Sequence, residues 1–222
     1  MNIVYAMTRN VYHMILPSLR SLSDTNPDAK VFILAEDDEL PFEHNAEVIN
    51  VSGQQWFPKS GVNYYNMFTY INLLKVVYQE MLRVDKVIHL DIDTIICDDL
   101  TPMWETDVTG KWFAACPEYL GGYKPFGDLY YNMGVALINL EQMRKDNAAE
   151  ELVEYLNTVK QPWADQDAWN IHLDKAVKLD VRYNESCKTG ETDDPAIVHY
   201  CSIGDWYTNK SIHRASYLNR YK

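Results

Sequence analysis

The sequence predicts an α/β domain whose central sheet is mostly parallel and flanked by helices. Short apolar segments alternate with amphipathic ones along the first half of the chain, which is the order of βαβ units. A length of 222 residues with 47% hydrophobic content suits one sizeable core rather than two. Two carboxylates follow one of the apolar segments, at the kind of strand end where such sheets bind ligands. We therefore expect a single domain with a ligand site at one edge of its sheet.

The elements of the first half follow from hydrophobic periodicity. Apolar runs bounded by turn residues predict strands, and apolar positions that repeat at steps of three and four predict helices. A long helix is expected over residues 63–83, because its apolar positions follow that helical spacing. Strands are expected at residues 2–6, 30–35, 47–51 and 86–96, with a helix through Ile15, Leu19 and Leu22 after the first strand.

The second half continues the same alternation. A loop from Pro117 to Leu129, which contains three glycines and two prolines, separates two further strands. The chain then returns to helical spacing before one last apolar run. Strands are expected at residues 112–116, 130–138 and 196–200, and helices at residues 140–159 and 165–173.

Charge and targeting signals exclude several classes of protein. The chain has 20 Lys and Arg against 32 Asp and Glu, and its net charge of −12 would repel a nucleic-acid backbone. No run of about 18 apolar residues and no secretory leader are evident, which predicts a cytoplasmic protein. The four cysteines lack the spacing of a metal finger, so we expect reduced thiols.

Two aspartates, Asp91 and Asp93, follow the apolar run 87–90. On a regular strand, residues i and i+2 share a face, so both carboxylates would come within reach of one hard cation. Unpaired burial of such groups is costly, which favours a metal or ligand site. The alternative is that the two acids cap the backbone of a turn. The pair alone is a weak indication, and other residues have to support it.

Three other segments supply that support. Asn132 and Gly134 lie inside an expected strand, where a glycine usually marks the close approach of a ligand or another backbone. Asp165 and Gln166 open an expected helix, although an acid there also serves as an N-terminal cap. His199 interrupts the last apolar strand and is either a core histidine with satisfied hydrogen bonds or a ligand.

In this order and spacing, the segments resemble glycosyltransferase family 8, the retaining transferases that include lipooligosaccharide galactosyltransferases and glycogenin. The matching segments extend over nearly the whole chain, and the most specific is the Asp-x-Asp segment with its continuation LTPMWETD. They are MNIVYAMTRN, DKVIHLDIDTIICDDLTPMWETD, WFAAC, YYNMGVALINL, WADQDAWN and IVHYC. The resemblance implies a GT-A type, Rossmann-like nucleotide-sugar-binding domain over residues 1–206. A short basic and aromatic tail would follow at residues 207–222.

The resemblance also implies the residues that bind a UDP-sugar donor and a divalent ion, usually Mn²⁺, with Mg²⁺ as the alternative. Asp91, Asp93 and His199 would hold the ion, and oxygen ligands with one imidazole suit Mn²⁺. Asp165 would contact the donor sugar, and Gln166 would lie on its reacting face. The other implied donor contacts are Tyr5, Ala6, Thr8, Ile92, Asn132 and Gly134.

Several positions depart from the family pattern. Asn72 stands where the family often has an arginine, and Lys75, three residues later, is the candidate for the missing charge. After His199, Gly204 lies in a shifted turn and Asp205 stands near an expected lysine, where an acid would repel phosphate. These departures leave open a catalytically impaired nucleotide-sugar-binding module.

The expected activity is transfer of glucose or galactose from UDP-glucose or UDP-galactose to a hydroxyl of a saccharide or glycolipid acceptor. The aromatic residues of the loop 117–129 are the expected acceptor wall, and a mobile surface loop is the alternative. The basic tail after residue 206 is either a solvated helix or a weak contact with an anionic acceptor or the inner membrane surface. A metal-dependent phosphohydrolase is disfavoured, because the sequence lacks the later lysine and paired acidic loop of that chemistry.

Overall fold

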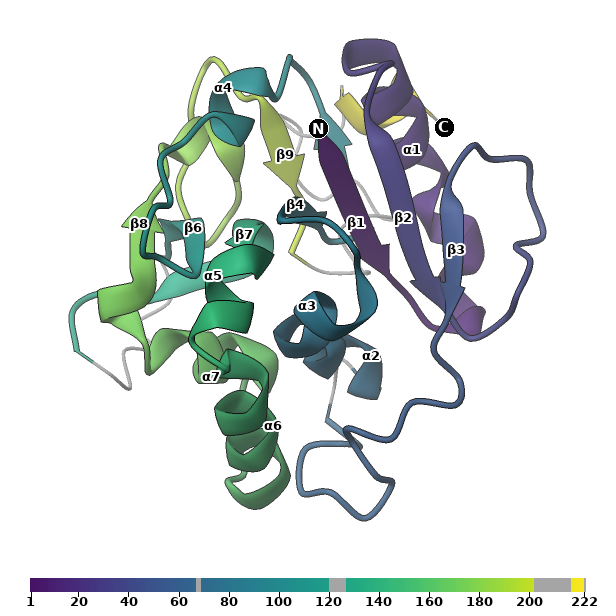
Figure 1. The fold of residues 1–222 in the computed structure, drawn as a ribbon. Helices are drawn as coiled ribbons and strands as arrows, with labels where there is room; N and C mark the ends of the chain where they lie inside the picture. Colours follow the sequence, from purple (N-terminus) through teal and green to yellow (C-terminus); the bar gives the residue numbers. More distant parts are fainter. Residues whose placement is uncertain (67–68, 120–126, 202–216, 222) are drawn as a thin grey trace.

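The computed structural model describes residues 1–66, 69–119, 127–201 and 217–221 (Figure 1). The strands are β1 Asn2–Ala6, β2 Lys30–Ala35, β3 Glu47–Asn50, β4 Lys86–Leu90, β5 Thr94–Ile96, β6 Phe113–Pro117, β7 Tyr131–Asn139, β8 Ala176–Lys178 and β9 Ile197–His199. The α-helices are α1 Leu16–Thr25, α2 Thr69–Leu73, α3 Tyr78–Met81, α4 Thr101–Trp104, α5 Leu140–Lys145, α6 Ala148–Thr158 and α7 Asp165–Asn170. Segments of 3₁₀ helix lie at Arg9–Ile15, Leu74–Val77, Leu173–Lys175 and Val181–Tyr183.

The described strands form a seven-stranded sheet in the order β3-β2-β1-β4-β7-β6-β8 and a two-stranded sheet of β5 and β9. Strands β3, β2, β1 and β4 run parallel to one another, as do β6 and β8. The long strand β7 runs antiparallel to both of its neighbours. The mostly parallel α/β sheet predicted from the sequence is therefore confirmed, with β7 as its exception.

Helices cover both faces of the large sheet (Figure 1). Side chains alternate along β1, so that Val4 packs into one core cluster while Ile3 and Tyr5 pack into the other. The cluster around Val4 contains buried residues of α2, α3, α5, α6 and α7. The other cluster contains residues of α1 and α4. The two clusters fix the sheet between the helical layers, so that its strand ends are held rigidly.

Two predicted helices differ from the observed ones. The helix expected at residues 63–83 begins only at Thr69 and changes to a 3₁₀ turn at Leu74–Val77 before α3. The helix expected at residues 140–159 is interrupted at Asn147, which takes a left-handed conformation with φ of 55°. Asparagine tolerates this conformation better than most residues, so the chain turns there between α5 and α6.

The strand expected at residues 86–96 is also wrong as a single element. β4 ends at Leu90, residues 91–93 form a turn, and β5 pairs antiparallel with β9 in a separate sheet. The two aspartates therefore lie in a turn between strands, and their approach does not come from the alternation of a regular strand. The edge strand β8, only three residues long, has no clear signal in the sequence.

Some predicted features lie outside the described residues. These are Gly204 and Asp205, most of the tail, and the central part of the loop between β6 and β7. The described end of the tail packs on the domain: Leu218 is buried, and Arg20 donates a hydrogen bond to the Tyr221 carbonyl at 3.0 Å. Among the described residues, no helix has the length and apolar character needed to cross a membrane.

Asn63 ties the turn before α2 to the end of α6. Its Nδ2 donates to the carbonyls of Leu156 and Val159, each at 2.7 Å, and its Oδ1 accepts from the backbone N–H of Gln161 at 2.9 Å. The side chain is fully buried, so Asn63→Ala would leave these polar groups without partners. We expect the free energy of unfolding to fall by about 3 kcal/mol, as measured by urea denaturation. The exposed control Asn45→Ala should change it by less than about 0.5 kcal/mol.

Candidate metal and donor site

The Asp91–Asp93 turn lies where β4 and its neighbours end. β1 and β4 are parallel with Val4 opposite His89, so the carboxyl ends of the two strands lie side by side. The backbone N–H of Asp91 donates to the carbonyl of Gly134 at 2.7 Å, which attaches the turn to β7. An edge that joins the ends of parallel strands is where open α/β sheets bind ligands.

The small sheet brings a third ligand to this turn. β5 starts directly after Asp93 and pairs with β9, so that Thr94 stands opposite His199. The backbone N–H of Tyr200 donates to the Asp93 carbonyl at 3.0 Å, which holds the end of β9 beside the turn. The pairing of two short strands thus places His199 beside two aspartates more than 100 residues earlier in the chain.

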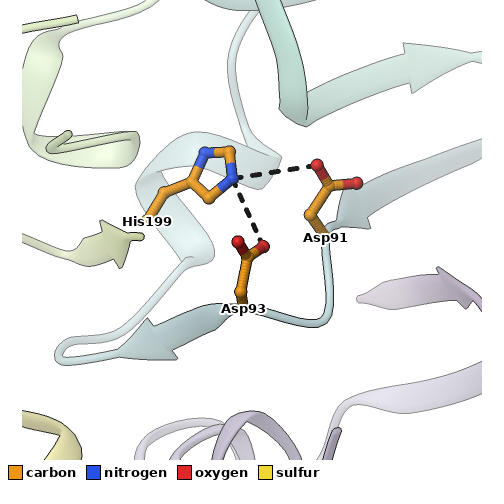
Figure 2. A group of neighbouring side chains, drawn as sticks. All are labelled: Asp91, Asp93 and His199. Atoms are coloured by element: carbon orange, nitrogen blue, oxygen red, sulfur yellow. Dashed lines mark ion pairs between the residues drawn. The ribbon is translucent and has the colours of Figure 1, made fainter. Parts of the chain in front are cut away.

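Asp91, Asp93 and His199 point toward one another (Figure 2). Nε2 of His199 lies 3.7 Å from Oδ2 of Asp91 and 3.4 Å from Oδ1 of Asp93. One ligand atom from each residue lies within 4.8 Å of the others. The His199 side chain is only 3% exposed and that of Asp91 is 28% exposed, so the group opens to solvent on one side. The structure therefore brings together all three predicted metal ligands.

Gly134 leaves the space that these side chains occupy. A Cβ added at this position would overlap Cε1 of His199 and lie 2.6 Å from Oδ2 of Asp91. Any side chain at this point of β7 would push the ring and the carboxylate apart. The glycine predicted the close approach of a ligand or another backbone, whereas the groups that approach it in the structure are the side chains of two predicted metal ligands.

Lys75 is a buried cation between the carboxylates. Its Nζ lies 3.4 Å from Oδ1 of Asp91 and 3.2 Å from Oδ2 of Asp165, and it donates to the Met133 carbonyl at 3.3 Å. Asp91, Asp93 and Asp165 as carboxylates outnumber the single ammonium group of Lys75, so the site has a negative charge that attracts a cation. The donor set and its charge both fit a hard divalent ion.

The charges also shift the acidities of these groups. Burial opposes ionisation of Asp91, but Lys75 and then His89 stabilise its carboxylate, and its pKa lies well below the usual value. Burial, with a smaller contribution from Asp91, raises the pKa of Asp165 to about 6, although Lys75 opposes the shift. Burial lowers the pKa of His199, but Asp93 and Asp91 outweigh it and the net shift is upward. A proton and a metal ion would therefore compete for this imidazole.

The predicted donor contacts lie beside the cluster. Asn132 donates from Nδ2 to Oε1 of Glu118 at 2.7 Å and accepts the Gly134 N–H at 3.0 Å. Gln166 accepts the Met133 N–H on its Oε1 at 3.0 Å and donates from Nε2 to the same Glu118 oxygen at 3.2 Å. The structure thus brings Asn132 and Gln166 to one carboxylate oxygen, and Asn132 in turn accepts from Gly134.

Glu118 and His89 are site residues that the sequence reasoning missed. Glu118 follows the apolar strand β6, as Asp91 follows β4, so its position after a strand was the available signal. His89 lies within β4 and is 1% exposed. Its Nε2 lies 3.0 Å from Oδ1 of Asp91 and its Nδ1 lies 3.1 Å from the Tyr78 hydroxyl. Burial, assisted by the charge of Lys75, lowers the pKa of His89 to about 4, so the ring is neutral at pH 7.

The remaining predicted donor contacts lie in or just after β1, just after β4, and on α2. Tyr5 is fully buried in β1, and its hydroxyl lies 2.9 Å from that of Ser18. Ala6, Thr8 and Ile92 are partly exposed near the same strand ends. Asn72 is partly exposed on α2, whereas Lys75, on the 3₁₀ turn that follows, is the cation that reaches the cluster.

Comparison with known proteins identifies the family. The family model described as Glycosyl transferase family 8 matches residues 3–204. The chain belongs to glycosyltransferase family 8. This membership confirms the resemblance seen in the Asp-x-Asp segment and the segments around it.

Solved structures confirm the fold of this family 8 chain. A structure of the galactosyltransferase LgtC with donor and acceptor sugar analogues superposes with a TM-score of 0.71 at 24% identity, covering 100% of this chain and 96% of LgtC. Glycosyltransferase GlyE of Streptococcus pneumoniae TIGR4 gives a TM-score of 0.66 at 18% identity, covering 99% of this chain and 62% of GlyE. The family 8 chain therefore has a GT-A fold.

Curated relatives are longer than this family 8 chain. A putative glycosyltransferase of Haemophilus influenzae is 29% identical over 127 residues, which are 52% of this chain and 38% of the relative. Glycosyltransferase GlyA of Streptococcus pneumoniae serotype 4 is 29% identical over 152 residues, which are 63% of this chain and 22% of GlyA. The alignments thus cover less than half of these two relatives.

The space at Gly134 can be tested with one added methyl group. We expect Gly134→Ala to weaken Mn²⁺ binding by about tenfold or more, because the Cβ would separate His199 from Asp91. Isothermal titration calorimetry with Mn²⁺ and UDP measures the change. The control Gly53→Ala meets no atom within 4 Å and should bind Mn²⁺ as the wild type does. Equal Mn²⁺ affinities for Gly134→Ala and wild type would show that the cluster does not bind the ion.

Proposed function

We propose that this family 8 chain is a metal-dependent, retaining glycosyltransferase that moves glucose or galactose from UDP-glucose or UDP-galactose to an acceptor hydroxyl. The observation that carries the proposal is the cluster of Asp91, Asp93 and His199 beside Gln166, on a GT-A fold. The acceptor would be a saccharide or a lipid-linked glycan. LgtC is named a galactosyltransferase, which supports a hexose as the transferred group.

The three ligands and the charge around them support a divalent ion, with Mn²⁺ favoured and Mg²⁺ as the alternative. When bound, the ion would neutralise the donor diphosphate and act as a Lewis acid toward the leaving group. Asp91, Asp93 and His199 would hold it, while Lys75 balances the charge of Asp91 and Asp165 from the protein side. The ammonium group of Lys75 is buried and paired, so it supports the carboxylates rather than replacing a direct phosphate contact.

Gln166 is the proposed residue on the reacting face of the sugar. Its amide is held at both ends, by the Met133 N–H and by Glu118, so that its orientation is fixed before the donor binds. An amide is a poor nucleophile, and we assign Gln166 electrostatic support of the anomeric carbon rather than a covalent bond. In a front-face displacement the acceptor hydroxyl would attack from the side that the phosphate leaves, which retains configuration, and the departing phosphate would accept its proton, so that no dedicated base is needed.

The acceptor is expected to lie on the side of Tyr119. This side chain is 56% exposed at the start of the loop between β6 and β7. Nζ of Lys178 lies 5.6 Å from the centroid of the Tyr119 ring. Tyr119 directly follows Glu118 in the sequence. An aromatic face at this position suits stacking against a sugar ring.

The weak membrane contact of the tail and the cytoplasmic location stay predictions from the sequence.

Removal of one metal ligand tests the proposal. We expect Asp93→Ala to lower both sugar transfer and the slow hydrolysis of UDP-glucose or UDP-galactose by about 100-fold or more, because the ion would lose a carboxylate ligand. UDP release in the presence of Mn²⁺ measures both activities. The fold should persist, since the Asp93 backbone keeps its bond to Tyr200. The exposed control Asp24→Ala should leave activity unchanged.

Two outcomes would replace this proposal. Hydrolysis that is unchanged in Asp93→Ala would contradict the metal role of the cluster. Calorimetry that detects binding of UDP with Mn²⁺, without turnover of any sugar nucleotide, would indicate the impaired binding module that the departures at Asn72 and Asp205 suggest.

A further inference from the structure

Asn184 joins the metal ligands to the donor contacts through two side-chain hydrogen bonds. Its Oδ1 lies 2.9 Å from Nδ1 of His199, and its Nδ2 donates to Oδ1 of Asn132 at 2.9 Å. The side chain is 0% exposed, so water does not compete for either bond. Asn184 is not among the residues that the family resemblance implies for the site.

The backbone around Asn184 is held on both sides. Its N–H donates to the Val181 carbonyl at 3.0 Å, and its own carbonyl accepts from the Thr189 hydroxyl. The N–H of His199 donates to the carbonyl of the next residue, Glu185, at 2.9 Å. The segment that carries Asn184 is therefore paired with β9, and the amide is placed beneath the imidazole by the main chain.

The direction of each hydrogen bond follows from neighbouring groups that can only donate or only accept. Oε1 of Glu118 accepts from both Asn132 and Gln166, so Asn132 presents its NH₂ group to it. The Gly134 N–H donates only, and it meets Oδ1 of Asn132 at 3.0 Å. That oxygen must also accept the NH₂ group of Asn184, which leaves the oxygen of Asn184 for His199. Nδ1 of His199 must then carry the hydrogen.

We propose that Asn184 is a positioning residue that holds His199 as the Nδ1–H tautomer and so leaves the lone pair of Nε2 for the ion that Asp91 and Asp93 would also hold. The inference rests on the metal site of the proposed function. The second nitrogen of a metal-binding histidine commonly donates to a fixed acceptor, which sets both tautomer and ring orientation. Because the same amide also holds Asn132, the metal ligand and the donor-sugar contact are positioned together.

The tautomer can be measured without any metal. Nitrogen chemical shifts of ¹⁵N-histidine-labelled, metal-free protein, followed upward in pH until the His199 ring is neutral, should show the Nδ1–H form, with His199→Gln assigning the signal. Asn184→Ala should move the population toward the Nε2–H form. The control Cys201→Ala removes a thiol 3.6 Å from the same nitrogen and should leave the tautomer unchanged. An unchanged Nδ1–H form in Asn184→Ala would overturn the proposal.

Mn²⁺ affinity provides the second readout. Titration of Mn²⁺ alone, followed by the electron paramagnetic resonance signal of the free ion, should show binding to Asn184→Ala weakened by about 10- to 100-fold. Asn184→Asp keeps an acceptor for Nδ1–H and should recover part of this loss. The matched control Asn63→Ala also removes a fully buried asparagine and should lose stability without losing Mn²⁺ affinity.

The outcomes separate this inference from the proposed function. Wild-type affinity in Asn184→Ala, or an equal loss in Asn63→Ala, would overturn the positioning role. A wild-type protein that binds no Mn²⁺ would contradict the metal site of the proposed function, and the tautomer measurement would still decide the effect of Asn184 on His199.

Discussion

The approach of His199 and Asp91 to the Cα of Gly134 is the contact on which the rest of the site depends. A glycine in the interior of a strand normally lowers stability by about 0.5–1 kcal/mol relative to alanine. At this position it allows β7 to run beside the ends of β4 and β9 while two ligands occupy the space of the absent side chain. The metal cluster therefore depends on a backbone position as much as on its three side chains.

Charge balance explains how several carboxylates can be packed close together at this site. Asp91 and Asp165 would repel each other strongly in a buried site, and Lys75 lies between them at ion-pair distance from both. His89, a neutral ring, bonds the same Asp91 oxygen as Lys75, so that Oδ2 is the oxygen nearer His199. The site thus keeps a residual negative charge that attracts a cation.

The sequence predicts most of the strands, the sheet class and the three residues of the cluster, because each leaves a local signal: an apolar run, a pair of acids, or a polar residue in an apolar strand. It does not predict the turn at Asp91–Asp93, since the apolar residues on both sides continue a strand pattern. It also does not reveal Glu118 or Asn184, which act through partners distant in the chain. Such contacts follow from strand pairing, and no residue spacing encodes them.

The central claim is that His199 and the two aspartates bind one metal ion together. Electron spin echo envelope modulation of the Mn²⁺–UDP complex detects a nitrogen atom bound directly to the ion. The account predicts modulation from one imidazole nitrogen in the wild type and its loss in His199→Gln, while His89→Gln keeps it. Mn²⁺ that binds in the presence of UDP without nitrogen modulation in the wild type would contradict the account.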